Sequence, residues 1–158
     1  MSLSRTDSVR EIEVQWGDLD SAGIVFYPHF FAWADAGTHQ LFRAADLPMD
    51  RLLRERKMSF GLVASAADFH SPARYGDRLV CRSGVSKLGA RSIELLHRMV
   101  RAEDGTAVAT VRETRVCMDL SEPDRIRAQA LPQDVSSGLR RFQIDRAAVL
   151  ATTRSAVR

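Results

Sequence analysis

Two carboxylates, Asp18 and Asp20, stand in a short glycine-containing loop directly before a long apolar segment that starts at Pro28. We expect that segment to be a helix, because a proline suits the first helical position, where a backbone N–H has no partner to lose. The start of a helix presents unpaired N–H groups and partial positive charge. An acid beside such donors can attack a carbonyl carbon, or activate water for that attack, while the donors hold the carbonyl oxygen. We therefore place the chemistry of this chain at this loop.

Asp20 is the stronger candidate of the two acids. An aspartate in a loop usually caps a helix or shapes a turn, and Asp18 fits that role. Asp20 faces the expected helix start, and Trp16, Phe26 and Tyr27 stand near enough in the chain to form an apolar pocket around it. Spacing alone supports a turn role and a catalytic role for Asp20 equally.

Several other chemistries are excluded by spacing. The pattern Asp18-x-Asp20-x-x-Gly23 is similar to the start of a calcium-binding EF-hand loop, but His29 stands where a bidentate glutamate is required. The chain has no HExxH or CxxC zinc motif, no G-x-S-x-G elbow, no Walker loop and no dinucleotide-binding G-x-G-x-x-G. We expect no metal site.

The composition is typical of one globular domain of 158 residues, with 45% hydrophobic and 27% charged residues. The net charge is +3, but the arginines are interspersed with acids, which favours a solvated surface over a nucleic-acid interface. We expect no signal peptide, no membrane span, and buried free thiols at Cys81 and Cys117. A cytoplasmic protein without nucleic-acid or membrane partners follows from these features.

The hydrophobic pattern predicts a strand, two helices and then a series of strands. Residues 9–16 alternate as a half-buried strand with Ile12, Val14 and Trp16 toward the core. Gly37, in the middle of the first helix, indicates close approach by another backbone. Helices are expected at 28–45 and 48–57, and strands at 62–73, 78–88, 91–102, 106–120 and 126–131. This is an α+β layout, in which a curved antiparallel sheet wraps around the first helix.

The expected domain spans residues 9–142. Residues 1–8 are interpreted as a disordered or tag-like start. Residues 143–158 are interpreted as a polar tail that forms a loose helix or is disordered.

The loop and its surroundings resemble the 4-hydroxybenzoyl-CoA thioesterase family of hotdog-fold proteins. The matching segments are residues 17–28 (GDLDSAGIVFYP), 33–36 (WADA), 71–77 (SPARYGD) and 125–128 (RIRA). The resemblance implies a hotdog fold of five to six antiparallel strands around a long central helix. It also implies homodimers that pair their sheets edge to edge, dimers of dimers, and active sites at the subunit interface.

The activity implied by the resemblance is hydrolysis of an acyl-CoA thioester to free acid and CoA. The acyl group would be an aryl group such as 4-hydroxybenzoyl, or a short to medium acyl chain. The family's catalytic carboxylate falls on Asp20, as nucleophile or general base, and its carbonyl-polarising backbone N–H falls on Tyr27. No cofactor is needed, because CoA is part of the substrate.

The same resemblance assigns further positions to substrate binding. Gly23 belongs to the loop, and Arg91 and Arg127 fall where the family binds the CoA phosphates. The chain departs from the aryl-CoA enzymes at Gly89 and Ala90, where those enzymes carry two more basic residues. For Asp35 two interpretations stand open: contact with a polar substituent of the acyl group, across the subunit interface, or a polar group satisfied at the dimer seam.

Two alternatives remain. A non-catalytic scaffold that binds acyl-CoA or an acyl carrier would bind the substrate without turnover. A hotdog dehydratase is disfavoured, because its His-Phe-Pro-Gly motif is missing where His29-Phe30 continues into Phe31-Ala32.

Overall fold

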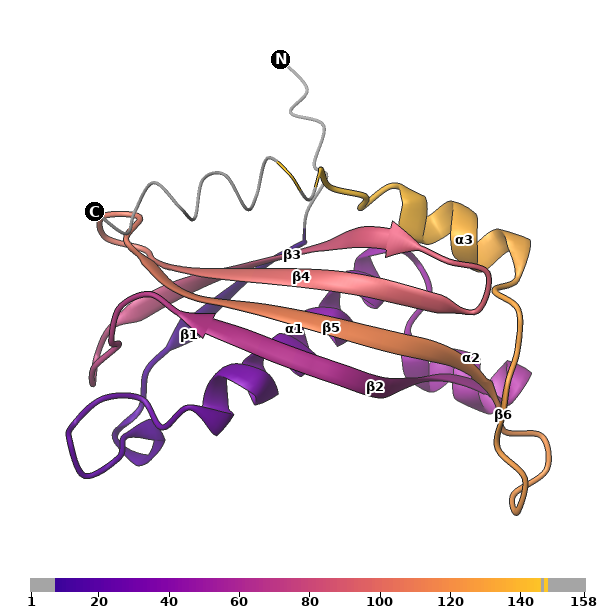
Figure 1. The fold of residues 1–158 in the computed structure, drawn as a ribbon, viewed down its shortest axis with the longest axis horizontal. Coiled ribbons are helices and arrows are strands. Elements are labelled where there is room, and N and C mark those ends of the chain that lie inside the picture. The colour runs from indigo at the N-terminus through magenta and orange to yellow at the C-terminus, as the bar shows by residue number, and fades with distance from the viewer. Residues whose placement is uncertain (1–7, 146, 148–158) are drawn as a thin grey trace.

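The computed structural model describes residues 8–145 and 147 and is built on one antiparallel sheet (Figure 1). The strands are ordered β1-β3-β4-β5-β2, and β6 pairs with the end of β5. Their bounds are β1 Ser8–Glu13, β2 Met58–Phe69, β3 Arg78–Leu88, β4 Ser92–Arg101, β5 Ala107–Asp119 and β6 Arg127–Ala128. The helices are α1 Pro28–Ala44, α2 Met49–Arg56 and α3 Gln133–Arg140, with a single 3-10 turn, η1, at Trp16–Asp18.

Helix α1 packs along one face of this sheet, against β1, β3, β4 and β5. Its stripe of Phe30, Ala34, Leu41 and Phe42 is fully buried, as the apolar spacing predicts. Gly37 makes room for side chains of the sheet and not for another backbone as predicted, because a Cβ at this position would lie 2.6 Å from Ser83 Oγ. The expected α+β layout, with the sheet around the first helix, is confirmed.

A buried polar cluster lies between α1 and the sheet. His97 Nδ1 is 2.7 Å from Ser83 Oγ, and Thr38 Oγ1 donates a hydrogen bond of 2.7 Å to Glu113 Oε2. Arg115 Nε donates a further bond of 2.9 Å to the same oxygen. Burial on its own would raise the pKa of Glu113, but the hydrogen bonds from His97 and Arg115 outweigh it and lower the pKa to about 2. Glu113 is therefore a permanent anion at neutral pH.

The first strand is shorter than the sequence predicts, and the expectation that Trp16 faces the core is wrong. Val14 leaves the β1–β3 ladder and instead exchanges hydrogen bonds with Gly76 and Asp77. The chain then enters η1, where Trp16 is 75% exposed and packs edge-on against Tyr75, with ring centroids 5.6 Å apart. Ile12 and Val14 are buried as expected.

The second strand begins at Met58 and ends at Phe69, four residues earlier at each end than residues 62–73. Gly61 suggests a break in the sequence, yet it lies inside the strand opposite Val116. A Cβ there would lie 2.6 Å from Met118 Sδ, so the glycine makes room for a methionine side chain. The following residues, 70–73, form a connection along the start of β5.

Helix α3 is absent from the sequence prediction, and β6 is shorter than the expected strand at 126–131. Gly138 interrupts the helical pattern of α3, but its lack of a side chain lets the helix pack on Leu47. Val135 and Leu139 are fully buried in the same core. The tail expected from residue 143 is described as far as Asp145, and Gln143 forms a bridge with Val85. Apart from residue 147, the remaining terminal residues lie outside the described part of the chain.

Both cysteines are free and buried, as the sequence predicts. Burial raises the pKa of the Cys81 thiol to about 11, which keeps it protonated and unreactive. In the described part of the chain, no helix combines the length and apolarity that crossing a bilayer requires.

Candidate active site

The loop that carries the two acids folds back on itself between η1 and α1. Asp20 N–H donates to Ile24 O at 2.8 Å, and Phe26 N–H donates to Asp18 O at 2.8 Å. Gly23 closes the turn with a φ of +74°, a conformation that favours glycine over residues with a Cβ. We call residues 18–26 the catalytic loop. Gly23 shapes this loop, and its own atoms do not line the cavity described below.

The two carboxylate oxygens of Asp20 have different surroundings. Oδ1 accepts hydrogen bonds from Ala22 N–H at 2.8 Å and Ile24 N–H at 3.4 Å, which is a turn-stabilising arrangement. Among the described residues, none donates a hydrogen bond to Oδ2. Asp20 therefore serves the turn with one oxygen and keeps the other available for chemistry.

Tyr27 immediately precedes α1, and Pro28 occupies the first helical position. Within the described residues, no acceptor takes the Tyr27 N–H, and Pro28 has no N–H of its own. The free donor thus stands at the positive end of a helix of 17 residues. This is a suitable place for an oxygen that gains negative charge.

Asp20 and Tyr27 line the same cavity, which has a volume of about 480 Å³. Its opposite wall is the end of β2 and the connection after it, including Phe69, Ser71 and Pro72. Val25 N–H donates to Ala73 O at 2.9 Å, which ties the catalytic loop to this wall.

The lining of the cavity is mainly apolar and aromatic. Phe30 and Phe69 contribute two rings whose centroids lie 5.5 Å apart. The expectation that Trp16 and Phe26 help to form the pocket is wrong. Trp16 is turned toward Tyr75 and Phe26 is half exposed on the outer side of the loop, so Tyr27 is the one of the three that contributes.

Asp35 lies on α1 eight residues after Tyr27, which is about 12 Å along the helix axis. It does not line the cavity of its own chain. Its Oδ1 accepts a hydrogen bond of 2.5 Å from Arg115 Nη2, and its Oδ2 lies 3.7 Å from His39 Nε2.

Arg91 and Arg127 lie at the opposite end of the sheet from the cavity. Phe69, on the cavity wall, pairs with Ala109, whereas Arg127 pairs with Asp119 at the far end of β5. Ten strand residues with a rise of about 3.4 Å each separate these two points by about 34 Å. Arg91 lies near the same far end, where its carbonyl accepts the Cys117 N–H. Within one chain, these two cations do not reach Asp20.

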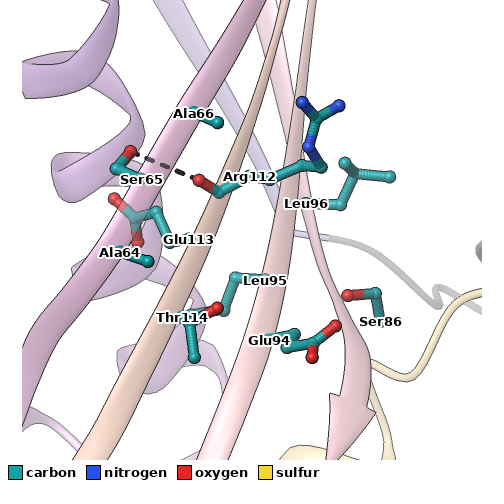
Figure 2. Close-up of a pocket in the computed structure, with 10 residues that line it drawn as sticks. All are labelled: Ala64, Ser65, Ala66, Ser86, Glu94, Leu95, Leu96, Arg112, Glu113 and Thr114. Atoms are coloured by element: carbon teal, nitrogen blue, oxygen red, sulfur yellow. Dashed lines mark hydrogen bonds between the residues drawn. The ribbon is translucent and has the colours of Figure 1, made fainter.

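A second hollow, of about 250 Å³, crosses β3, β4, β5 and β2 (Figure 2). Its ionisable side chains already have partners, because Arg112 pairs with Asp68 at 2.7 Å and Glu113 belongs to the buried cluster. It contains neither Asp20 nor Tyr27, so it is not the place for the predicted chemistry. The described residues contain no group of three or more His, Cys, Asp or Glu side chains that could hold a metal ion.

The sequence predicts a site at Asp20 and Tyr27, which line one cavity in the structure, but it does not predict the opposite wall of that cavity. The predicted strand at 62–73 places Phe69 in its interior, whereas β2 ends at this residue and the start of the 71–77 segment continues the wall. The pairing of β2 with β5 is what carries this segment to the catalytic loop.

Comparison with known proteins places this arrangement in a family. Residues 14–139 match the model of the thioesterase-like superfamily. The chain belongs to this superfamily. The expected family is thereby confirmed, and so are the hotdog fold and the thioester hydrolase class.

The relatives of this superfamily member include enzymes named for aryl-CoA substrates. The chain is 29% identical to 4-hydroxybenzoyl-CoA thioesterase of Pseudomonas sp. (strain CBS-3) over 77% of this chain and 89% of the relative. It is 26% identical to 1,4-dihydroxy-2-naphthoyl-CoA hydrolase of Synechocystis sp. over 78% of this chain and 87% of that protein. A solved variant of 4-hydroxybenzoyl-CoA thioesterase in complex with 4-hydroxybenzoyl-CoA superposes with a TM-score of 0.79 at 26% identity, covering 85% of this chain and 99% of that one.

Proposed function

We propose that this thioesterase hydrolyses an aryl-CoA thioester to the free acid and CoA. The observation that supports the proposal is the cavity that Asp20 and Tyr27 both line, where among the described residues one oxygen of Asp20 and the N–H of Tyr27 have no hydrogen-bond partner. A nucleophile or base opposite a preorganised donor is the minimal arrangement for acyl transfer.

Tyr27 N–H would hold the thioester oxygen, and the start of α1 would stabilise the negative charge that develops on it. Asp20 Oδ2 then either attacks the carbonyl carbon to form a mixed anhydride, which water hydrolyses to the free acid and the restored carboxylate, or removes a proton from a water that attacks the carbonyl directly. The sulfur departs as a thiolate, whose parent thiol has a pKa of about 8.5, so a dedicated acid is not required.

An aryl acyl group fits the lining of the cavity. Phe30 and Phe69 contribute aromatic residues to the lining, and flat rings pack well edge to face or offset against one another. The names of the relatives point to the same class, because both curated enzymes act on hydroxylated aryl-CoA thioesters.

A second copy of the chain would complete the site. β2 is an edge strand, and Leu62, Val63 and Phe69 on it are 51%, 61% and 52% exposed. A long edge with exposed apolar side chains is a template for pairing with another strand. Antiparallel pairing of two β2 strands around a twofold axis inverts the second sheet. It would carry Arg91 and Arg127 of the partner subunit toward this chain's cavity, where they could bind the CoA phosphates.

Asp35 lies on the β2 side of α1, since it contacts Arg115 of β5.

The test is release of CoA from a panel of aryl-CoA and short to medium acyl-CoA thioesters by the wild type and by Asp20→Asn. Loss of a nucleophile or base should lower kcat about a hundredfold or more. Equal rates for the two proteins would contradict the proposal. Saturable binding of the thioesters without CoA release by the wild type would instead support the scaffold that binds acyl-CoA without turnover.

A further inference from the structure

Asp18 lies at the junction of three segments of the site. Its Oδ2 accepts a hydrogen bond of 2.8 Å from Gln15 N–H, in the segment that leaves β1. Its backbone carbonyl accepts the Phe26 N–H and so closes the catalytic loop. Its Oδ1 lies 3.6 Å from His29 Nδ1, in the first turn of α1. One carboxylate thus links the entry of the loop to the helix whose start carries Tyr27.

His29 is held in a fixed place by its neighbours. Its ring centroid lies 6.3 Å from that of Phe26 and 6.1 Å from that of Trp33. The side chains of His29 and Asp18 are 35% and 19% exposed, so water screens the attraction between the carboxylate and the imidazole only in part. A contact in this position restrains the loop more than a fully exposed one would.

The restraint matters because the two reacting groups belong to different elements. Asp20 is carried by the catalytic loop, and the Tyr27 N–H is fixed by the start of α1. The backbone bonds inside the loop set its shape, and one further backbone bond, from His29 N–H to Phe26 O at 3.0 Å, joins its end to the first turn of α1. The contact of Asp18 with His29 adds a side-chain link at the same junction, and the bond from Gln15 N–H fixes the entry of the loop.

We propose that Asp18 is a positioning residue for the hydrolysis: through His29 it holds the catalytic loop against the first turn of α1 and so places Asp20 relative to the Tyr27 N–H. The inference rests on the proposed function. Asp18 itself does not line the cavity, so it acts through Asp20 and not on the substrate.

The test compares Asp18→Asn, His29→Gln and the double variant in steady-state kinetics on the best aryl-CoA substrate. Asp18→Asn retains an oxygen that can accept the Gln15 N–H, and it removes the charge that faces His29. Because misplacement of a reacting group by about 1 Å can cost up to about a hundredfold, we expect kcat to fall about tenfold or more in each single variant. KM should stay unchanged, since the substrate contacts are intact. The double variant should lose no more than Asp18→Asn alone, because both changes break the same link.

Asp134→Asn is the matched control. Asp134 lies in α3, remote from the cavity, and its carboxylate accepts hydrogen bonds of 2.7 and 3.1 Å from Arg56 of α2. Removing this charge should leave kcat unchanged. Thermal unfolding of each variant separates positioning from loss of structure, and we expect the two loop variants to unfold near the wild-type temperature.

Three results would overturn the inference. One is a wild-type kcat in Asp18→Asn while Asp20→Asn is inactive, which would leave the proposed function standing. Another is a wild-type kcat in His29→Gln, which would show that the contact of Asp18 with α1 through His29 does not position Asp20. The third is a fall in kcat that is matched by an equal fall in the fraction of folded protein. A wild-type rate in Asp20→Asn would instead contradict the proposed function itself.

Discussion

Arg115 Nη2 lies 2.5 Å from Asp35 Oδ1, so a half-exposed carboxylate on α1 is bound by a guanidinium that is only 5% exposed. The same guanidinium donates through Nε to Glu113, which is buried. Asp35 is therefore fixed in position and joined to the polar cluster under the helix. A fixed carboxylate suits either interpretation of Asp35, since both contact with a substrate hydroxyl and a seam between subunits require an acceptor in a defined place.

Removal of Arg115 should destabilise the fold strongly. In Arg115→Ala, Glu113 keeps its charge but loses a buried cationic partner, and breaking a buried pair from one side costs about 3–5 kcal/mol. Arg112→Ala is a control on the same strand, because the pair of Arg112 with Asp68 is much more exposed and should contribute about 1 kcal/mol or less. The measurement is the free energy of unfolding in urea. Similar losses in the two variants would contradict the assignment of Arg115 as a buried anchor.

Acid should weaken the fold through Glu113 in a defined pH range. Its pKa is about 2 in the folded chain, against an ordinary value of 4.5 for a glutamate side chain. Because the folded pKa is the lower one, the unfolded chain binds the proton first, and stability is lost as the pH falls from about 4.5 to about 2. Glu113→Gln has no such proton to bind. Its free energy of unfolding, measured at steps across this range, should therefore fall less steeply than that of the wild type. Parallel slopes would show that other carboxylates account for the acid sensitivity.

The sequence predicts the parts of this molecule that depend on local pattern. Strand β3 has the expected bounds, because turn residues flank it and its alternation is regular. Helix α1 begins at Pro28, directly after Tyr27, as predicted, because a proline at the first helical position has no N–H that would need a partner. Trp16 shows the limit of the pattern: alternation continues through it in the sequence, but the backbone hydrogen bonds of Val14 have already turned the chain out of the sheet.

The parts that the sequence does not predict depend on contacts between distant segments. Arg115 and Asp35 are separated by 80 positions, and no spacing rule relates them. Gly61 and Gly138 look like breaks in isolation, but each makes room for a side chain of another element, Met118 and Leu47. Phe69 likewise becomes part of the cavity only once β2 has paired with β5.

If Arg91 and Arg127 bind the phosphates of CoA, their loss should weaken binding of the nucleotide part of the substrate. The reaction at the thioester carbonyl should be unaffected. We expect Arg91→Ala and Arg127→Ala to raise KM for the CoA thioester about tenfold, since a hydrogen bond to a charged group contributes roughly 1.5–3 kcal/mol. A truncated thioester that carries the same acyl group without the nucleotide should be hydrolysed equally well by the wild type and both variants. An unchanged KM for the full substrate would mean that other groups hold the phosphates. Arg127 already lies 3.6 Å from Glu122, and that pair alone would then explain its position.

A charge on the exposed edge of β2 should separate the subunits and impair catalysis at the same time. Val63 lies at the register shift in the β2–β5 pairing and is 61% exposed, so a lysine there is accommodated in one chain but not between two paired edges. Leu53→Lys, on α2, is the control, because Leu53 is 46% exposed but belongs to a helix, which offers no strand edge for pairing. Light scattering should give the mass of two or four chains for the wild type and for Leu53→Lys, and the mass of one chain for Val63→Lys. KM for the CoA thioester should rise in Val63→Lys, because the phosphate-binding cations are supplied by the second subunit. A monomeric wild type with full activity would contradict both the edge pairing and the shared site, since the cations of one chain lie about 34 Å from its own cavity.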